Sequence, residues 1–521
     1  MASNVNLDAL IPREDFAVPG TEKQPEKSAM SLNELREKEL FFTGLRKPDF
    51  QRETAEWNPK RVVGLIKTFI EGDLIPAVIL WQHEGLLFVI DGSHRLSALI
   101  AWVHDDYGDG ALSRSFFDNV IPEEQRKAAV LTREMVKKSF GSYKTHLEAV
   151  QKPDAYHADL VTRARRLAYR TLNLQWMSGD AKKAEQAFIR INQQAAMIQP
   201  EELKLIESRK KPGTIAARAI IRQGTGHKYW SSFAPDVQAE VAALATELHQ
   251  LLFTPALVSP LSSDDVPAGG GVYAATALPM VSDFVTLCNG SEEQLNDDDG
   301  AKTVSYLTRC RKVMRLLLSS HPSSLGLHPA VYFYSWTGKQ QPVLFLTVAA
   351  IMIELEQKNR LQKFIGIRSD LERFLIENRS LINQVVRKYG TKSSGGKQLR
   401  SFYADVLRLL WEGTSVDDLA TALTQKYTFL QPEEKPYEGQ TGGKASSKVK
   451  AGVILKTHLQ GAPSCPICGG FVPTQANSVD HKQRRADGGS GAATNLQLTH
   501  PYCNSSKQQL IAEPRQAAGS A

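Results

Sequence analysis

Two short pairs of cysteine and histidine residues restrict the fold of this chain more than any other feature. Cys465 and Cys468 form a Cys-x-x-Cys pair, and His500 and Cys503 form a His-x-x-Cys pair with the same spacing. Three thiolates and an imidazole are the ligand set of a closed, tetrahedral structural zinc site. A domain of about sixty residues has little core of its own, so a metal ion would supply missing stability. The sequence therefore predicts a small zinc-bound domain over residues 453–521.

A second group of polar residues lies between and just after these pairs. Asp480 and His481 are adjacent, and Asn495, Asn504 and Lys507 follow. A neutral imidazole can take a proton from water at neutral pH, and a divalent cation held by a carboxylate can neutralise charge on a phosphate. These residue types favour phosphodiester hydrolysis. The alternative is a zinc ribbon that only binds nucleic acid or protein, which leaves the spacing of Asp480, His481 and Asn495 as coincidence.

The segment from Cys465 to Lys507 resembles the HNH, or ββα-metal, nuclease family. The resemblance implies that His481 is the general base, that Asp480 holds a catalytic divalent ion, and that Asn495 orients the His481 loop. Asn504 stands where the family commonly has a histidine ligand. An amide oxygen favours a hard ion, Mg²⁺ or Mn²⁺, at this position. We count Lys507 with the catalytic residues.

Positive charge is concentrated around this motif. The whole chain carries a formal charge of +7, and nine of its basic residues against three acidic ones lie beyond residue 440. DNA is the polyanion that such a segment would bind, with a solvated tail as the alternative. The residues expected to contact DNA phosphates are Lys482, Arg484 and Arg485.

A strand-turn-helix pattern marks a second candidate site near residue 91. The apolar run 86–90 predicts a strand, and residues 96–103 predict a helix. Between them lies Asp91-Gly92-Ser93-His94-Arg95. A helix that begins after such a turn offers free backbone N–H groups, with Ser93 and Arg95 beside them, which is a plausible phosphate cradle. Arginines that only stabilise the fold are the alternative.

This half of the chain resembles the GmrSD-type N-terminal domain, a relative of the ParB-like fold. The resemblance rests on Gln51-Arg52, on the Asp91–Arg95 segment, and on Phe188-Ile-Arg190-Ile-Asn192. It implies nucleotide binding or hydrolysis, with ATP or GTP as the nucleotide, or sensing of modified DNA. Ser93-His94 replaces the two glutamines of many members. The sensing residues implied are Gln51, Arg52, Asp91, Gly92, Ser93, His94, Arg95, Arg190 and Asn192.

The chain as a whole is expected to be an α+β multidomain protein. The expected parts are a loose arm (1–30), a ParB-like α/β domain (31–230), a helical region (231–430), a flexible basic linker (431–452) and the HNH domain (453–521). No signal-peptide pattern and no apolar run long enough for a membrane is present, which favours a cytoplasmic protein. Association into oligomers is compatible with the sequence.

These patterns together predict a bacterial or phage-encoded restriction nuclease of a type IV-like kind. An N-terminal sensor would control the HNH domain, because an unregulated nuclease harms its host. Two alternatives remain: a homing or repair endonuclease, and a non-catalytic DNA-binding regulator with a ParB-like fold and a zinc ribbon.

Overall fold

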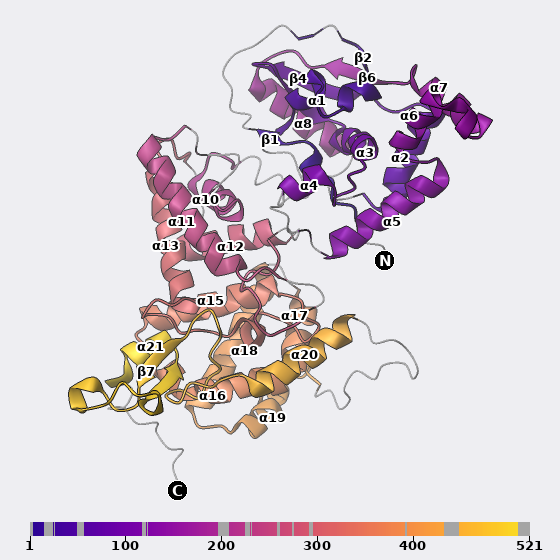
Figure 1. Cartoon of the computed structure of the whole chain (residues 1–521). Helices are drawn as coiled ribbons and strands as arrows, with labels where there is room; N and C mark the ends of the chain where they lie inside the picture. The colour runs from indigo at the N-terminus through magenta and orange to yellow at the C-terminus, as the bar shows by residue number, and fades with distance from the viewer. Residues whose placement is uncertain are drawn as a thin grey trace, which may run out of the picture. The chain divides into compact units, whose positions relative to one another are not determined.

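The computed structural model divides the chain into two compact units, residues 1–209 and residues 210–521 (Figure 1). The first unit is mixed α/β, and the second is mostly helical. No helix in the described part of the chain combines the length and the apolar character that crossing a membrane requires. The structure describes residues 4–14, 24–25, 27–48, 57–116, 121, 123–195, 208–224, 230, 232–257, 261–272, 276–290, 295–390, 393–431 and 447–508.

A six-stranded mixed sheet forms the centre of the first unit. Its strands are β1 (Arg13–Glu14), β2 (Ala29–Ser31), β3 (Leu45–Pro48), β4 (Val78–His83), β5 (Leu86–Asp91) and β6 (Thr171–Trp176). The spatial order is β1-β3-β5-β4-β6-β2. β4 and β5 form an antiparallel hairpin. β3 pairs parallel with β5, and β6 pairs parallel with β4, so the hairpin lies in the middle of the sheet.

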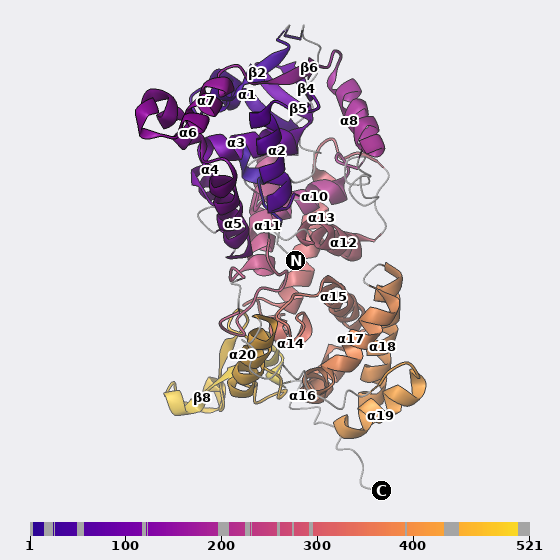
Figure 2. The ribbon, with the colours of Figure 1, turned by 90° about the vertical axis from the view of Figure 1, so that its right-hand side faces the viewer.

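Successive side chains of β4 and β5 point to opposite faces of the sheet, so the apolar residues of these strands contribute to two different cores. Leu80 and Val89 pack with residues of α2 (Pro59–Glu71) and α3 (Ser93–His104) on one face. Trp81 and Phe88 pack with residues of α8 (Ala181–Ala195) on the other face. Figures 1 and 2 show these helices around the sheet.

Helix α2 begins and ends at residues that favour the start and the end of a helix. The side chain of Asn58 accepts a hydrogen bond from the Arg61 backbone N–H at 3.0 Å, and Pro59 follows at the first helical position. Gly72 ends the helix with a φ of 82°. The other helices of this unit are α1 (Leu40–Gly44), α4 (Ala111–Phe116), α5 (Glu123–Ser139), α6 (Tyr143–Gln151) and α7 (Ala158–Leu167), with 3₁₀ turns η1 (Asp8–Leu10), η2 (Leu32–Leu35) and η3 (Pro153–Ala155).

The N-terminal segment is not a loose arm over its described residues, which corrects the expectation for residues 1–30. Val5 and Ile11 are fully buried in the core of the first unit. Asp8 accepts a hydrogen bond from the buried Lys47 ammonium at 2.5 Å and from Arg13 at 2.8 Å. The apolar residues of this segment follow no helical or strand period, which is why the pattern did not predict their burial. Residues 15–23 lie outside the described residues.

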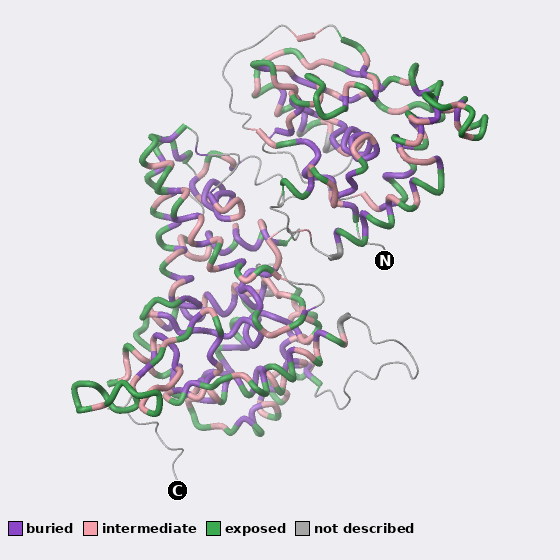
Figure 3. The backbone as a smooth tube through the Cα atoms, viewed as in Figure 1, coloured by how far each residue is buried: buried purple, intermediate pink, exposed green. Residues whose placement is uncertain are grey.

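Helices make up most of the second unit, and its buried residues form one continuous core (Figures 2 and 3). The unit begins near residue 210, earlier than the boundary expected at 230. Its helices up to residue 431 are α10 (Pro212–Ile221), α11 (Pro235–Phe253), α12 (Ala277–Asn289), α13 (Ala301–Leu317), α14 (Pro329–Tyr332), α15 (Pro342–Gln357), α16 (Leu361–Glu377), α17 (Arg379–Tyr389), α18 (Ser393–Trp411) and α19 (Val416–Lys426).

The end of the expected flexible linker is helical. Residues 447–452 are the start of α20 (Ser447–Gly461), while residues 432–446 lie outside the described residues. Ala451, Leu455 and Leu459 are buried at a spacing of four, which gives the helix an apolar stripe. The sequence before this stripe is rich in Gly, Ser and Lys, and this composition led to the prediction of a flexible linker.

A small ββα arrangement follows α20. It consists of the antiparallel strands β7 (Ser478–His481) and β8 (Leu496–Thr499) and the short helix α21 (Pro501–Ser505). The 3₁₀ turns η4 (Arg485–Asp487) and η5 (Ala493–Asn495) lie in the connection between the strands. Most of this connection is exposed, as Figure 3 shows in green.

Candidate active site and metal centre

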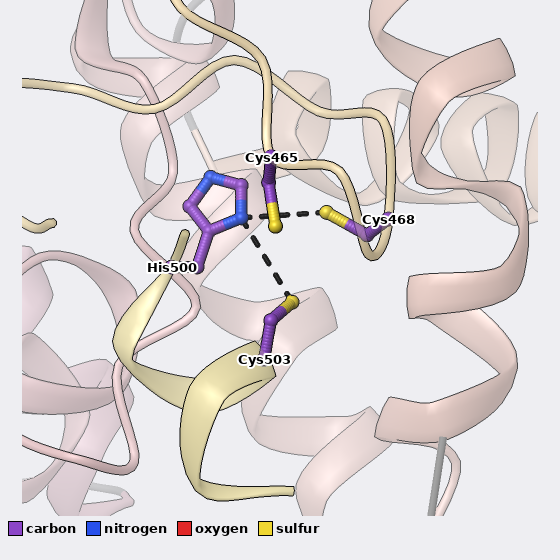
Figure 4. A group of neighbouring side chains, drawn as sticks. All are labelled: Cys465, Cys468, His500 and Cys503. Atoms are coloured by element: carbon purple, nitrogen blue, oxygen red, sulfur yellow. Dashed lines mark hydrogen bonds between the residues drawn. The ribbon is translucent and has the colours of Figure 1, made fainter. Parts of the chain in front are cut away.

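The two predicted ligand pairs meet in one buried cluster. One ligand atom from each of Cys465, Cys468, His500 and Cys503 lies within 4.8 Å of the others, and all four residues are buried (Figure 4). The first pair lies on a tight turn after α20, where the Cys465 N–H donates to the Gly470 carbonyl at 2.8 Å. The second pair lies at the start of α21. This Cys₃His cluster could hold a zinc ion.

The orientation of His500 suits a metal ligand. Its Nδ1 lies 3.3 Å from Cys468 Sγ and 3.9 Å from Cys503 Sγ (Figure 4). Its Nε2 lies 2.8 Å from the carbonyl oxygen of Phe471 and donates a hydrogen bond to it. The Nδ1 atom therefore carries the lone pair, which faces the thiols. Burial lowers the pKa of His500, which favours the neutral imidazole that a metal requires.

Each thiol of the cluster changes the pKa of its neighbours. Hydrogen bonds from Cys468 and Cys503 lower the pKa of Cys465, which makes it the first thiolate. Its hydrogen bond with Cys465 raises the pKa of Cys468 to about 12, and the pKa of Cys503 is raised by the same neighbour. A divalent ion at the centre of the cluster would supply the missing positive charge.

Asp480 lies on β7 with its carboxylate turned toward the C-terminal helix. The carboxylate is buried, and its Oδ2 accepts hydrogen bonds from Lys507 Nζ and Gln497 Nε2, each at 2.8 Å. Asp480 and Gln497 are direct cross-strand partners in the β7–β8 pair. Lys507 also donates to the backbone carbonyl of His481. Gln497 was not among the predicted residues. Pairing the two strands from the sequence would have placed its polar side chain opposite Asp480.

Asn495 fixes the loop that follows His481. Its Oδ1 accepts from the Gln483 backbone N–H at 2.9 Å, and its Nδ2 donates to the carbonyls of Gln483 at 3.0 Å and Ser490 at 2.7 Å. The backbone carbonyl of Asn495 accepts from the Lys482 N–H at 2.7 Å. Within the described residues, the imidazole of His481 makes no hydrogen bond or ion pair. It is therefore available to a water molecule or a substrate.

Asn504 lies on α21 beside the same strand. Its Nδ2 donates to Ser478 Oγ at 2.8 Å, which leaves the Oδ1 atom as a candidate ligand. Ser478 and Asp480 share one face of β7, because alternate strand residues point the same way. The structure thus brings Asp480, Asn504 and Lys507 together on that face. Ser478 is a further residue that the sequence reasoning missed.

The basic residues expected to contact DNA lie on the exposed connection between β7 and β8. Lys482, Arg484 and Arg485 are all exposed. Lys482 Nζ donates to the Thr494 carbonyl at 3.0 Å, and Arg484 lies 3.8 Å from the Asp487 carboxylate. Neither contact buries the cations.

The candidate site of the first unit lies where β5 leads into α3. Arg95 Nη2 donates to Asp91 Oδ2 at 2.6 Å and to the Ala77 carbonyl at 3.3 Å. Gly92 takes a φ of 96°, and a Cβ atom there would lie 2.9 Å from both Arg95 Nη2 and Val78 Cγ2. Only glycine therefore allows this turn to pass so close to the guanidinium.

The remaining predicted sensing residues are placed only in part. Ser93 is buried at the first position of α3, and no side chain caps this helix. The ring of His94 stacks on Trp57 with a centroid distance of 5.5 Å. Arg190 is exposed on α8. Gln51, Arg52 and the side chain of Asn192 lie outside the described residues.

Comparison with known proteins assigns two segments of the chain. Residues 32–206 match the family described as GmrSD restriction endonuclease, N-terminal domain. Residues 465–510 match the HNH endonuclease family. No curated protein and no solved structure matches the chain, so the ParB-like fold stays a prediction. The chain thus joins a GmrSD-type N-terminal domain to a C-terminal HNH endonuclease domain, the combination of a restriction-type nuclease.

Proposed function

We propose that this protein is a metal-dependent DNA endonuclease of a bacterial defence system, similar in kind to type IV restriction. The observation that carries this proposal is the grouping of Asp480, Asn504 and Lys507 on one face of β7. His481 is the next residue of this strand, and within the described residues its imidazole makes no hydrogen bond or ion pair. The basic, exposed loop beside them suits a DNA backbone.

In this mechanism, His481 accepts a proton from a water molecule whose oxygen attacks the phosphorus atom. The bond between phosphorus and the leaving oxygen then breaks. Asn495 holds the backbone after His481, so that the imidazole keeps its position during this step. Asp480 and Asn504 would hold Mg²⁺ or Mn²⁺, which when bound stabilises negative charge on the phosphate. Lys482, Arg484 and Arg485 would hold the neighbouring phosphates.

The Cys₃His cluster would hold a structural zinc ion in this proposal. It supplies no open ligand position, because all four residues are buried and converge on one point. Its role is to fix the strand β8 and helix α21 that carry Gln497 and Asn504. The zinc ion and the catalytic ion therefore have separate ligands.

We propose that the first unit senses a nucleotide, ATP or GTP, or modified DNA, and controls the nuclease. The start of α3 supports this role, because backbone N–H groups at a helix start and the Arg95 guanidinium both attract phosphate. A phosphate that binds Arg95 would compete with Asp91 for the guanidinium. The ion pair at 2.6 Å would then be the contact that binding changes.

The decisive experiment for the nuclease is His481→Ala in the full chain. We expect plasmid nicking with Mg²⁺ or Mn²⁺ to fall by about 10² to 10⁴, the usual contribution of a general base, with DNA affinity unchanged. His157→Ala removes a well-exposed imidazole from the first unit and is the matched control. Equal nicking by His481→Ala and wild type would refute the assignment. A wild-type chain that cuts no DNA under any condition would favour the DNA-binding regulator.

The sensing role is tested with modified and unmodified phage DNA, each with and without ATP and GTP. We expect cutting to depend on the modification or on the nucleotide, and Arg95→Ala to abolish that dependence. Arg61→Ala, which changes an exposed residue of α2, is the control. Unchanged nucleotide binding and unchanged regulation in Arg95→Ala would refute this part. Cutting without any such dependence would favour a homing or repair endonuclease.

A further inference from the structure

The Cys₃His centre belongs to the core of the helical unit. Cys465, Cys468 and Cys503 pack in the same continuous cluster of buried residues as Leu371 and Phe374 of α16. A small nuclease domain on a flexible tether would instead have a separate core. The predicted ligands are therefore part of a core that they share with the helices.

A buried ion pair on α16 contacts the segment that follows Cys465 and Cys468. The side chains of Arg368 and Glu372 are almost wholly inaccessible to solvent, and Arg368 Nε lies 2.7 Å from Glu372 Oε1. The two other guanidinium nitrogens donate to the backbone carbonyls of Leu325 and Gly326. Moving ions out of water costs several kcal/mol each, so such a pair persists only with hydrogen bonds as complete as these.

Glu372 connects this pair to a metal ligand. Its Oε2 accepts from the Phe471 backbone N–H at 2.7 Å. The Phe471 carbonyl accepts in turn from His500 Nε2 at 2.8 Å, the contact that turns Nδ1 toward the thiols. Glu372 Oε1 also accepts from the Tyr332 hydroxyl at 2.9 Å, which fixes the carboxylate from α14.

Arg368 supports the other half of the centre through the loop before α14. The loop carbonyl of Ser324 accepts from the Tyr502 N–H at 2.9 Å, which holds the start of α21. A Cβ atom on Gly326 would lie 2.8 Å from His500 Cδ2. The guanidinium therefore fixes the loop against which His500 packs.

We infer that Arg368 and Glu372 are positioning residues for the metal centre, so that zinc, the ligand-bearing segments and the helical unit form one cooperative structure. This inference rests on the zinc site of the proposed function. Groups that orient metal ligands through hydrogen bonds commonly contribute 10- to 100-fold to metal affinity. Glu372 does so through the Phe471 backbone, and Arg368 holds both Glu372 and the loop beneath His500.

The test measures zinc affinity of the full chain by competition with a chromophoric chelator. We expect Glu372→Gln to weaken zinc binding by about 10- to 100-fold. Glu377→Gln is the matched control, because Glu377 lies on the same helix and makes an exposed i,i+4 pair with Arg373 at 3.8 Å. Its affinity should equal that of wild type. Equal affinities in all three proteins would overturn the inference.

Hydrogen exchange of the wild-type chain with and without zinc tests the cooperative structure and does not require a folded variant. We expect zinc removal to increase exchange in residues 465–472 and also in residues 361–377. Faster exchange confined to residues 465–503 would overturn the inference. A wild-type chain that binds no zinc would refute the zinc assignment itself, an outcome distinct from equal affinities. DNA cleavage enters neither readout.

Discussion

Lys507→Met is predicted to strengthen binding of the divalent ion proposed at Asp480. In the structure, the Lys507 ammonium lies 2.8 Å from Asp480 Oδ2, on the carboxylate that would hold the ion. Both side chains are mostly buried, with 12% and 7% of their surfaces exposed. An arriving Mn²⁺ ion must therefore compete with an ammonium that is part of the same chain.

The magnitude follows from this geometry. Two unit charges 2.8 Å apart attract each other by about 6 kcal/mol at an effective dielectric constant of 20. Loss of one partner of a buried pair costs ~3–5 kcal/mol, and the remaining hydrogen bond from Gln497 places the expected loss near the lower value. At roughly 2 °C for each kcal/mol in a large domain, the melting temperature without Mn²⁺ should fall by about 6 °C.

The assay is calorimetric titration of Mn²⁺ into the zinc-loaded chain, together with thermal unfolding at each Mn²⁺ concentration. We expect Lys507→Met to bind Mn²⁺ at least about tenfold more tightly, which is ~1.4 kcal/mol, and to recover stability as Mn²⁺ binds. Lys312→Met is the control, because it breaks an exposed pair with Glu356 and should cost less than about 1 kcal/mol. Unchanged or weaker Mn²⁺ binding by Lys507→Met would show that the ammonium does not compete with the ion.

Three further predictions follow from other contacts. Asn495→Ala removes three hydrogen bonds that fix the loop after His481, which should destabilise that loop by ~1–3 kcal/mol. DNA nicking should slow while the zinc content stays the same. Undiminished nicking would contradict the role of Asn495. Gly326→Ala should lower the free energy of unfolding of the second unit by at least about 1 kcal/mol, as measured by denaturant unfolding, because Gly326 has a φ of 57° and a Cβ atom there would meet His500. Gly366→Ala is the control, because a Cβ atom at this position of α16 meets no other atom; it should be neutral or slightly stabilising. Burial lowers the pKa of His146, so the unfolded chain binds a proton at this residue more readily than the folded chain does. The melting temperature should therefore fall as the pH drops below about 6.5. His146→Phe should reduce this pH dependence.

The sequence predicted the local parts of the nuclease well because their chemistry is encoded in short spacings. Two residue pairs with the same interval predicted a cluster of Cys465, Cys468, His500 and Cys503, and the structure places these residues together. The apolar run 86–90 predicted the strand β5, and the pattern of residues 96–103 predicted the helix α3. Each of these signals lies within a few neighbouring residues.

The contacts that join distant segments were not predictable in this way. Arg368 and Glu372 are separated by one helical turn, and such a pair is usually a solvated surface feature. Glu372 also accepts a hydrogen bond from Phe471, about a hundred residues later, and no local sequence pattern indicates this contact. The same reason explains Asp8 and Lys47 in the first unit, whose pairing needs β1 beside β3.

The order in which a ribosome makes this chain has a consequence for the host. Arg368, Glu372 and the loop around Gly326 are made before Cys465. Cys503 is made after the other three residues of its cluster, and Lys507 is made after Asp480. A nascent chain therefore has its helical platform first and lacks a complete metal centre until Cys503 emerges. Translation that stops before residue 465 would release a fragment without the segment that matches the HNH endonuclease family. Under the proposed function, such a fragment would not cut DNA.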